Sequence, residues 1–331
     1  MTKNKKAKTR ALMLLSGGLD SILAVKILQE QDIDVTGLTF VSYFFNFELA
    51  KKAAQQLKIK LKIIDFSDEH LVMVKNPPHG YGKAVNPCID CHVLMLKKAK
   101  EVSGIGQAPN RDSPLGTVLE SRTVPKGLSL FDFIATGEVL GERPMSQNKQ
   151  ALELIEKQSG LPGYLLRPLS AKLLKPTIAE KKGLINRDKL LDISGRSRKR
   201  QIALAKKWGI KDYPTPAGGC LLTDLQFAQR LKELFAKWPD CHGNDVLLLK
   251  LGRHFWVDGN KIIVGRNKEE NKKIKKLSQK GDLLIEPKSF PGPSILIRSK
   301  IKLSQESLIR AKELMIKYSP KLKKQRTLTN K

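Results

Sequence analysis

The sequence lacks any apolar run long enough to cross a membrane. A spanning helix needs roughly 20 consecutive apolar residues, and the basic residues 1–10 are not followed by the apolar core of a signal peptide. Only four of the 331 residues are cysteine, too few for the disulfide framework of a secreted protein of this length. These absences predict a cytoplasmic protein with no membrane partner.

Negative charge is also scarce. The chain holds 61 Lys and Arg against 32 Asp and Glu, a formal net charge of +29. An excess this large favours a polyanionic partner such as nucleic acid over an acidic small molecule, although a generally basic, well-solvated surface has the same composition. The length is that of about two domains.

A glycine-rich turn follows the first apolar run, at 11–15. Its glycines let the backbone turn sharply, and its serine and aspartate residues are typical of the start of a helix. The free amides of such a turn suit a phosphate group. A Walker loop would need a Lys-Ser or Lys-Thr pair after its second glycine, and none is present. The predicted phosphate-binding residues are Ser16, Gly17, Gly18, Asp20 and Ser21.

Short apolar runs then alternate with helical patterns. The runs at 35–41, 61–66 and 131–136 predict strands, and their alternation with helices predicts an α/β fold with a doubly wound parallel sheet. Ligands of such sheets bind at the carboxyl ends of the strands. We therefore expect Thr39 and Phe40 to line an adenine pocket, with ordinary strand packing as the alternative.

Three cysteines form the second feature with a chemical meaning. Cys88 and Cys91 begin the helical pattern at 88–102 and share one face of its first turn. That spacing alone suits zinc, a redox pair or an iron–sulfur site. Cys220 lies on a glycine-rich loop and adds a third thiol. A structural zinc site would want a fourth ligand, for which His92 or the otherwise incidental Cys241 is available.

The turn at 16–21, Ser-Gly-Gly-Leu-Asp-Ser, resembles the PP-loop of ATP pyrophosphatases, which adenylate a substrate oxygen and release pyrophosphate. The segment 135–147 and the Arg-Pro-Leu at 167–169 look like the corresponding run of tRNA 4-thiouridine synthetases, more closely than that of tRNA 2-thiouridylases. The resemblance implies ATP and Mg²⁺ as cofactors, with Asp20 holding the ion. It also implies that Thr136, Gly137 and Gln147 contact ATP or the reacting base.

The cysteine set Cys88, Cys91 and Cys220 resembles the one that holds a 4Fe-4S cluster in a class of tRNA thiolases. That resemblance implies catalysis by these cysteines and Asp20, with Zn²⁺ or a persulfide relay as alternatives to the cluster. The implied partners are tRNA and a sulfur donor, either sulfide or a persulfide derived from a cysteine desulfurase.

The pattern changes near residue 246 to short strands, predicted at 247–251, 255–257, 262–264, 283–285 and 294–297. The strings at 262–271 and 291–298 look like the RNA-binding module of NFACT-type proteins. Residues 243–331 hold 22 Lys and Arg against 8 Asp and Glu, as a phosphate-binding surface would. This module would substitute for the upstream RNA-binding domain of the 4-thiouridine synthetases, which this chain lacks.

A second basic cluster, at 196–200, opens a helix. Its cations oppose the helix dipole, which favours an anionic partner such as RNA phosphate over a solvated face. The predicted RNA-binding residues are Arg196, Arg198, Lys199, Arg200, Arg253, Arg266, Lys268, Lys272, Lys273 and Arg298.

The expected organisation is a basic tail at 1–10, a PP-loop domain at 11–237 and a linker at 238–243, followed by an RNA-binding domain at 244–318 and a flexible basic tail at 319–331. The weakly patterned stretch 103–130 is expected to be a long loop that serves as a lid, an RNA contact or an insertion. The predicted function is an ATP-dependent tRNA sulfurtransferase that forms 4-thiouridine or 2-thiouridine. The alternative is a non-catalytic nucleotide- and RNA-binding protein that acts on tRNA or the ribosome.

Overall fold

The computed structural model describes residues 8–105, 130–214, 220–287 and 290–319. The chain divides into two compact units, Met1–Thr223 and Asp224–Lys331. Most of the predicted loop at 103–130 and all but residue 319 of the predicted tail lie outside the described residues.

A five-stranded parallel sheet forms the centre of the first unit, with strand order β3-β2-β1-β4-β5. Its inner strands are apolar because both faces of the sheet are covered. Leu12 and Met13, neighbours on β1, are both fully buried, and they belong to different cores on the two faces. The strands are β1 (Arg10–Leu14), β2 (Asp34–Val41), β3 (Lys60–Asp65), β4 (Phe133–Thr136) and β5 (Leu165–Leu166).

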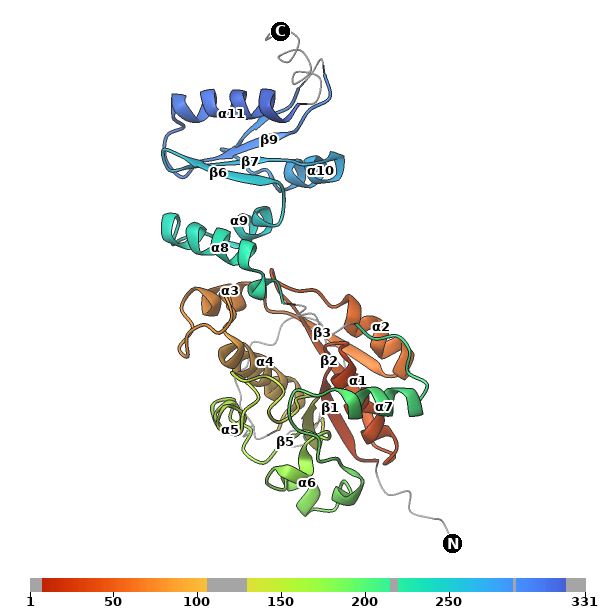
Figure 1. Cartoon of the computed structure of the whole chain (residues 1–331). Helices are drawn as coiled ribbons and strands as arrows, with labels where there is room; N and C mark the ends of the chain where they lie inside the picture. Colours follow the sequence, from red (N-terminus) through yellow and green to blue (C-terminus); the bar gives the residue numbers. More distant parts are fainter. Residues whose placement is uncertain (1–7, 106–129, 215–219, 288–289, 320–331) are drawn as a thin grey trace. The chain divides into compact units, whose positions relative to one another are not determined.

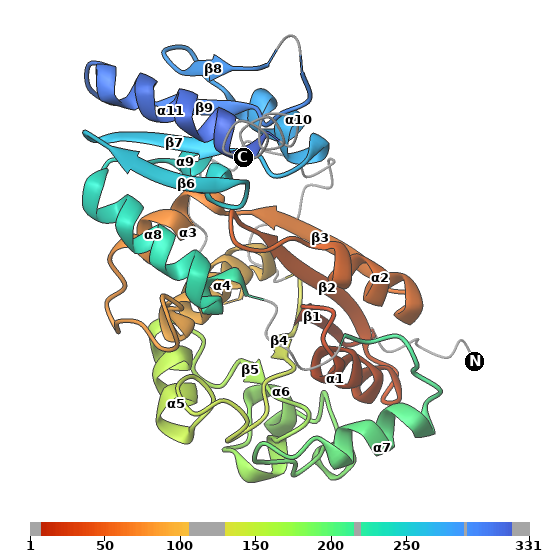
Figure 2. The ribbon, with the colours of Figure 1, turned by 45° about the horizontal axis from the view of Figure 1, so that its top comes forward.

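Helices cover both faces of this sheet (Figure 1). Residues of α1, α2 and α7 pack in the core on one face, and residues of α4 and α5 pack in the core on the other (Figure 2). This arrangement confirms the predicted doubly wound α/β fold. The helices are α1 (Leu19–Gln29), α2 (Glu48–Leu57), α3 (Ser67–Lys75), α4 (Cys88–Ser103), α5 (Lys149–Gln158), α6 (Ile178–Lys181) and α7 (Lys199–Lys207), with 3₁₀ turns η1 (Ala171–Leu173), η2 (Arg187–Lys189) and η3 (Leu221–Thr223).

The strand order places the topological switch between β1 and β4. From β1 the chain builds the sheet outwards through β2 to β3, and it then returns to the other side of β1 with β4 and β5. Connections therefore leave the carboxyl ends of β1 and β4 toward opposite faces of the sheet, which opens a crevice between them. The predicted phosphate-binding loop follows β1 directly, so the fold places it at this crevice.

The second unit holds a four-stranded antiparallel sheet with strand order β6-β7-β9-β8. One face packs on α11, where Ala311 and Leu314 meet Ile262 and Ile297, and Ile263 and Leu296 form a smaller core on the other face (Figure 1). The elements are α8 (Leu225–Lys237), α9 (Gly243–Leu249), β6 (Arg253–Val257), β7 (Asn260–Val264), α10 (Lys268–Leu277), β8 (Leu283–Ile285), β9 (Ile295–Arg298) and α11 (Gln305–Tyr318).

The strand predicted at 247–251 is wrong. Most of that segment belongs to helix α9, in whose first turn Asp245 Oδ2 accepts hydrogen bonds from the backbone N–H and the ring Nδ1 of His242. Such a capping box supplies the orphan amides of a short helix with partners. The apolar run was read as a strand because it is too short to display a helical period.

Among the described residues, none of the helices is both long and apolar enough to cross a membrane.

Candidate functional site

The loop between β1 and α1 has the geometry of a phosphate cradle. Gly17 has φ +79°, and a Cβ there would lie 2.3 Å from the backbone carbonyl carbon of Leu49, so only glycine fits. The Gly18 amide donates to Ser16 Oγ over 3.2 Å, and Ser21 Oγ donates to the Gly18 carbonyl over 2.8 Å. These bonds hold the backbone of the loop in a single conformation at the start of α1.

The end of β4 lies against this loop. A Cβ on Gly137 would come within 2.5 Å of the Ser21 nitrogen, so the two backbones are in direct contact. Thr136, the last residue of β4, is buried beside it. The crevice between β1 and β4 is therefore bounded on this side by main chain.

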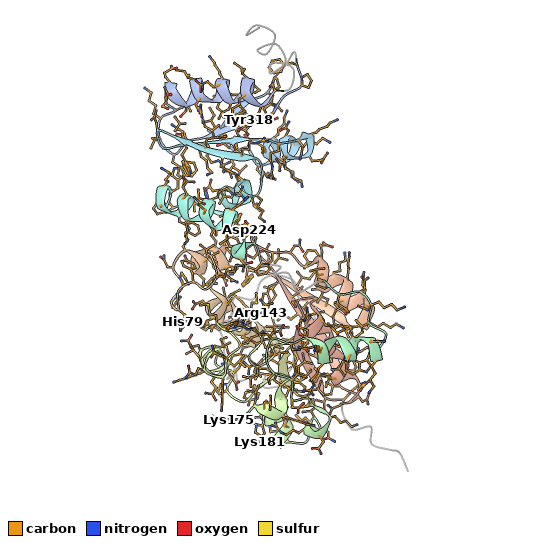
Figure 3. All side chains as sticks on the ribbon, viewed as in Figure 1. His79, Arg143, Lys175, Lys181, Asp224 and Tyr318 are labelled. Atoms are coloured by element: carbon orange, nitrogen blue, oxygen red, sulfur yellow. The ribbon has the colours of Figure 1, made fainter. Side chains whose placement is uncertain are left out.

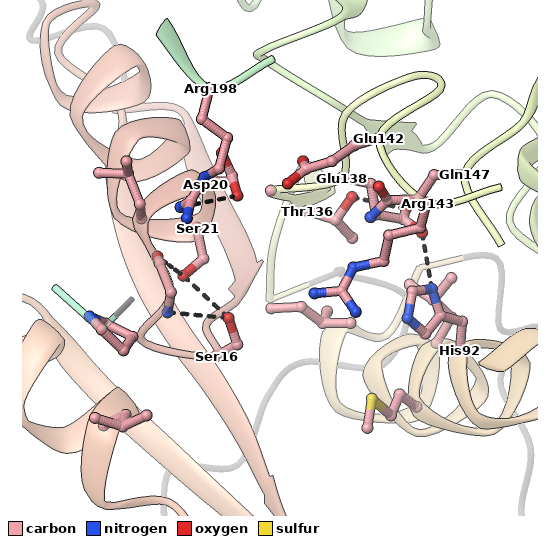
Figure 4. A pocket seen from close by; sticks show the side chains of 18 residues that line it. Ser16, Asp20, Ser21, His92, Thr136, Glu138, Glu142, Arg143, Gln147 and Arg198 are labelled. Atoms are coloured by element: carbon pink, nitrogen blue, oxygen red, sulfur yellow. Dashed lines mark hydrogen bonds and ion pairs between the residues drawn. The ribbon is translucent and has the colours of Figure 1, made fainter. Parts of the chain in front are cut away.

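A cavity of about 410 Å³ opens at this point (Figure 4). Apolar side chains such as Leu14, Leu49 and Met95 line part of it, and charged side chains line the rest. Gly17 does not line the cavity but shapes the loop from behind, and Thr39 and Phe40 are buried elsewhere. The predicted site residues that do line it are Ser16, Gly18, Asp20, Ser21, Thr136, Gly137, Gln147 and Arg198.

Thr39 and Phe40 lie on β2, which is separated from β4 by β1. Phe40 packs in the core against Phe66, with ring centroids 5.0 Å apart. Strand packing, the alternative considered from the sequence, describes their environment. We therefore leave both residues out of the proposed nucleotide site.

Asp20 carries the charge at the mouth of the loop. Burial raises its carboxyl pKa, and the nearby Arg198 is the largest of the influences that lower it. Arg198 Nη2 lies 3.8 Å from Asp20 Oδ2, and Asp20 Oδ1 is buried with no hydrogen-bond partner within the described chain. A partly desolvated carboxylate with an unused oxygen is suited to a divalent cation.

Two residues that the sequence reading did not single out complete the charged wall: Glu142 and Arg143 (Figure 4). Burial and the charge of Asp20 raise the pKa of the Glu142 carboxyl, and Arg143 and Arg198 oppose this. Figure 3 shows Arg143 among the side chains in the middle of the first unit. Both residues lie in the segment after β4, within the run 135–147. That position was the sequence signal that could have identified them as site residues.

A buried network of ion pairs and hydrogen bonds around Glu138 forms part of the cavity lining. Glu138 Oε1 bonds His92 Nδ1 over 2.8 Å, and its Oε2 accepts from Thr136 over 2.9 Å and from Arg167 Nε over 3.0 Å. Burial alone would raise the pKa of Glu138, but Arg167, His92 and Thr136 outweigh it and lower the pKa to about 2. Glu138 is therefore ionised, and it fixes the ring of His92, which lines the cavity.

The three cysteines come together in the same unit. α4 begins at Cys88, as predicted, which places Cys91 one turn along the same face. Burial is the main cause of a raised pKa at each thiol, to about 11 for Cys220 and well above the usual range for Cys91. The charges of Cys88 and Cys220 each raise the pKa of Cys91 further, which shows that the thiols interact.

Arg143 links these thiols to the cavity. It lowers the pKa of Cys88 and of Cys220, and it also lowers the pKa of Asp20 in the phosphate loop. One guanidinium group thus acts on both the predicted nucleotide site and the predicted sulfur site. The two sites are neighbours.

The arrangement of the same residues bears on whether they can bind a metal ion. Thiolates are suitable ligands for iron and zinc. Within the described residues, however, no group of three or more His, Cys, Asp or Glu side chains is arranged to hold a metal ion. Cys241 is buried in the second unit, whereas the other three cysteines belong to the first unit. The donor chemistry therefore suits a cluster, but the positions of the thiols do not form a metal-binding set.

The basic cluster at 196–200 does not form a single surface. Arg198 turns into the cavity, with 15% of its side chain exposed. Arg200 pairs with Asp192 on the exterior, and Arg196 and Lys199 are exposed. Only part of this cluster is thus available to an RNA backbone.

The predicted RNA-binding residues of the second unit also differ in accessibility. Arg298 is 5% exposed, and its guanidinium group bonds Asp245, Asp282 and Asn244, so we leave it out of the proposed RNA surface. The others lie on or near the exterior: Arg253 over the ring of Tyr318, Arg266 paired with Glu270, Lys272 paired with Glu269, Lys268 exposed at the start of α10, and Lys273 exposed in the middle of that helix.

Comparison with known proteins gives relatives for part of the chain. A tRNA-specific 2-thiouridylase MnmA from Syntrophomonas wolfei is 31% identical over 102 residues, which is 28% of this chain and 30% of that protein. The protein of the same name from Geotalea uraniireducens is 27% identical over 126 residues, 30% of this chain and 33% of that protein. The chain thus spans about a third of the length of these relatives.

Two solved structures align with part of the chain at low similarity. A 4-thiouridine synthetase in complex with RNA and ATP aligns at 16% identity with a TM-score of 0.36, over 72% of this chain and 53% of that one. A chain described as a predicted subunit of tRNA methyltransferase from Methanocaldococcus jannaschii aligns at 15% identity with a TM-score of 0.36, over 60% of this chain and 76% of that one.

Residues 252–329 match the NFACT protein RNA binding domain. The chain therefore joins a region similar to tRNA-specific 2-thiouridylases to a segment that matches the NFACT RNA-binding domain, which confirms the predicted resemblance to tRNA-thiolating enzymes and to an NFACT-type module. The relatives named above are 2-thiouridylases, so the closer resemblance of the segment 135–147 to 4-thiouridine synthetases stays a prediction.

Proposed function

We propose that this protein is an ATP-dependent tRNA sulfurtransferase that replaces a uridine oxygen with sulfur. The observation that carries the proposal is the position of Arg143, which acts electrostatically on Asp20 in the phosphate loop and on Cys88 and Cys220. An adenylating site beside a set of thiols is the arrangement that activation followed by sulfur transfer requires. The similarity to 2-thiouridylases supports the same reaction.

In the first step, ATP lies over the 16–21 loop, and Asp20 holds its magnesium ion. The uridine carbonyl oxygen attacks the α-phosphorus, a new O–P bond forms, and the bond to the β-phosphate breaks. Pyrophosphate leaves toward the backbone amides of the loop, whose fixed dipoles stabilise the charge that develops. Thr136, Gly137 and Gln147 also line the cavity, with Gly137 against the loop itself, and we expect them to contact the nucleotide or the base.

In the second step, a sulfur nucleophile at Cys88, Cys91 and Cys220 attacks the activated carbon of the base. A C–S bond forms, the C–O bond breaks, and AMP leaves with the former carbonyl oxygen. Burial keeps the thiols protonated even though Arg143 lowers the pKa of Cys88 and of Cys220, so formation of the thiolate would need a further positive charge at the site. The sulfur enters as sulfide, which gives the thiouridine directly, or as a persulfide made by a cysteine desulfurase. With a persulfide, the base is first joined through two sulfurs to one cysteine; a second cysteine of the set then attacks the inner sulfur, the S–S bond breaks, the thiouridine leaves, and a disulfide forms between the two cysteines.

A 4Fe-4S cluster on the three cysteines remains part of the proposal because thiolates suit iron. Their positions do not form a metal-binding set among the described residues, so neither step above passes through a cluster. Zinc and a persulfide relay remain the alternatives. Protein purified without oxygen that shows no visible charge-transfer absorption would exclude the cluster and favour the relay.

We assign tRNA binding to the second unit. Support comes from its match to an RNA-binding domain and from the exposed cations on and near α10. The site in the first unit would then act on a uridine of the bound tRNA.

The test measures thiolated nucleosides by mass spectrometry of digested tRNA from a strain that lacks the gene. We expect one thiouridine to disappear and to return with the wild-type gene or with Cys241→Ser, the matched control. Cys220→Ser and Asp20→Ala should not restore it. Unchanged thiouridine content in the deletion strain would contradict the proposal. RNA binding without tRNA-dependent AMP formation would favour the non-catalytic alternative.

A further inference from the structure

The start of helix α7 is electrostatically unusual. Arg198 is the N-cap residue, Lys199 and Arg200 follow, and no acidic residue lies in the first turn. The amino end of a helix carries partial positive charge, so each of these cations is unfavourable there. An anion at this end would compensate both the dipole and the side chains.

Arg198 faces the cavity at the phosphate loop (Figure 4). Its ion-pair partner, Asp20, is 3.8 Å away, longer than a hydrogen bond, and the Nε of Arg198 is buried with no hydrogen-bond partner in the described part of the chain. A guanidinium group held this way has donors left over for another acceptor.

Gln201 gives a second, independent observation. It is fully buried in the first turn of α7, and neither atom of its amide makes a hydrogen bond of good geometry with a described residue. Its amide nevertheless lies close enough to Asp20 to lower the carboxyl pKa. An unpaired buried polar group costs about 1–3 kcal/mol, which argues that a ligand supplies the missing partners.

We propose that Arg198, which lines the cavity, binds the β- and γ-phosphates of ATP, the part that leaves as pyrophosphate, and that Gln201, buried in the same turn of α7, supports this second phosphate-binding group. In the unliganded protein Arg198 lies 3.8 Å from Asp20 and opposes the rise of its carboxyl pKa. With ATP bound, Asp20 would hold the magnesium ion, Arg198 would donate to the phosphate oxygens, and the Gln201 amide would supply a further hydrogen bond.

This inference rests on the proposed function for the identity of the nucleotide. It assigns Arg198 to ATP, whereas the sequence pattern assigned it to RNA with its neighbours. The assignment to ATP suits the chemistry of arginine, because the forked guanidinium group matches two phosphate oxygens and pyrophosphate offers several.

The test titrates the full-length protein with Mg²⁺ and three ligands: ATP, inorganic pyrophosphate and AMP. A hydrogen bond to a charged group contributes about 1.5–3 kcal/mol, so Arg198→Gln should weaken ATP and pyrophosphate roughly 10- to 100-fold. AMP lacks the β- and γ-phosphates, and its affinity should change less than about twofold. Lys207→Gln removes an exposed cation from the same helix and serves as the matched control, with no change for any ligand.

Gln201→Leu separates a binding role from a structural one. Removing an unpaired buried amide should raise the melting temperature of the free protein while it reduces the stabilisation that ATP adds. A lowered melting temperature with unchanged ATP stabilisation would overturn the role of Gln201. Wild-type ATP affinity in Arg198→Gln, or equal losses for ATP and AMP, would overturn the role of Arg198.

The tRNA affinity of the Arg198→Gln variant distinguishes a role of Arg198 in ATP binding from a role in RNA binding. We expect Arg198→Gln to bind tRNA as the wild type does, and a tRNA defect with normal ATP binding would refute the inference. None of these measurements requires thiolation. A strain with unchanged thiouridine would therefore contradict the proposed function while the nucleotide titrations still decide this inference.

Discussion

One buried charge in each unit can be compared with the other: Glu138 in the first unit and Lys261 in the second have opposite environments. In the first unit, Glu138 is 7% exposed and bonds Arg167, His92 and Thr136. In the second, Lys261 is 2% exposed, and its ammonium group has no hydrogen-bond partner within the described residues. The first arrangement meets the requirement that a buried charge be paired and hydrogen-bonded, and the second does not.

The environment of Lys261 explains how an unpaired ammonium group persists there. It lies 4.1 Å from the centre of the Trp256 ring, its cross-strand neighbour, so a cation–π contact replaces part of its hydration. Burial lowers its pKa to about 8; Glu233 and Asp245 oppose this shift, and Arg230 and Lys237 add to it. Glu138 is held ionised by its partners, whereas Lys261 is close to losing its charge.

The contrast teaches which buried charges belong to the site. The Glu138 network touches the cavity through His92 and Thr136, and its cost is offset by complete hydrogen bonding. Lys261 touches no part of that cavity. A paired network of this kind keeps catalytic groups oriented, while a lone buried lysine mainly costs stability.

The largest expected effect comes from breaking the paired network. Arg167→Met leaves Glu138 buried with an uncompensated charge and should lower the free energy of unfolding by about 3–5 kcal/mol. Urea denaturation measures the loss, and hydrogen exchange should locate it in the first unit. The double variant Arg167→Met, Glu138→Gln removes the charge as well and should recover most of the loss. A single variant as stable as the wild type would show that the network contributes nothing.

An intermediate effect of opposite sign is expected at Lys261. The pKa falls from 10.5 to about 8 on folding, a penalty on the order of 3 kcal/mol for the charged form. Lys261→Met removes this penalty together with the contact to Trp256, and at pH 7 it should stabilise the second unit by roughly 2 kcal/mol. Native-state hydrogen exchange of the full chain measures the change unit by unit.

The same shift fixes the pH dependence of that effect. Between pH 8 and pH 10.5 the unfolded lysine keeps its proton and the folded one does not, so the unfolded state binds more protons and stability rises with pH. The advantage of Lys261→Met over the wild type should therefore shrink across this window. An advantage that stays constant up to pH 10.5 would show that the charge of Lys261 is not its source.

The smallest effect is expected at the exterior. Arg200 and Asp192 form an ion pair in which more than half of each side chain is exposed. Water and salt screen such a pair. Arg200→Gln should therefore leave the melting temperature unchanged within error. If Arg200→Gln lowered the stability as much as Arg167→Met does, the exposed fraction of an ion pair would not determine how much the pair contributes to stability.

Much of the first unit could be predicted from sequence because its signals are local. The apolar run at 11–15 and the glycines after it identify a buried strand and a phosphate loop without knowledge of the rest of the fold. The first turn of α4 was predicted correctly for the same reason, because Cys88 follows a proline-rich loop and begins a run with apolar residues at helical spacing.

The strand order was not available in the same way. Thr39 and Phe40 end a strand, and residues at strand ends do line sites in this class of fold. Whether a given strand borders the crevice depends on the order β3-β2-β1-β4-β5, which no local pattern encodes. The placement of Glu142 and Arg143 depends on the same order, because the crevice opens beside β4.

The basic cluster at 196–200 shows a similar limit. Charge density predicts an anionic partner, but it does not reveal which cation turns inward. The signal that separates Arg198 from its neighbours is Gln201, an uncharged polar residue three positions later that becomes fully buried. Burial of that residue became visible only when α7 was seen to pack on α1.

The backbone contact between Gly137 and Ser21 limits how this site can diverge. Where two main chains touch, no exchange of side chains can enlarge or reshape the wall, and any residue larger than glycine would force β4 and the loop apart. Point substitutions can therefore reshape the site only where side chains line the cavity, as those of Glu142, Arg143 and Arg198 do.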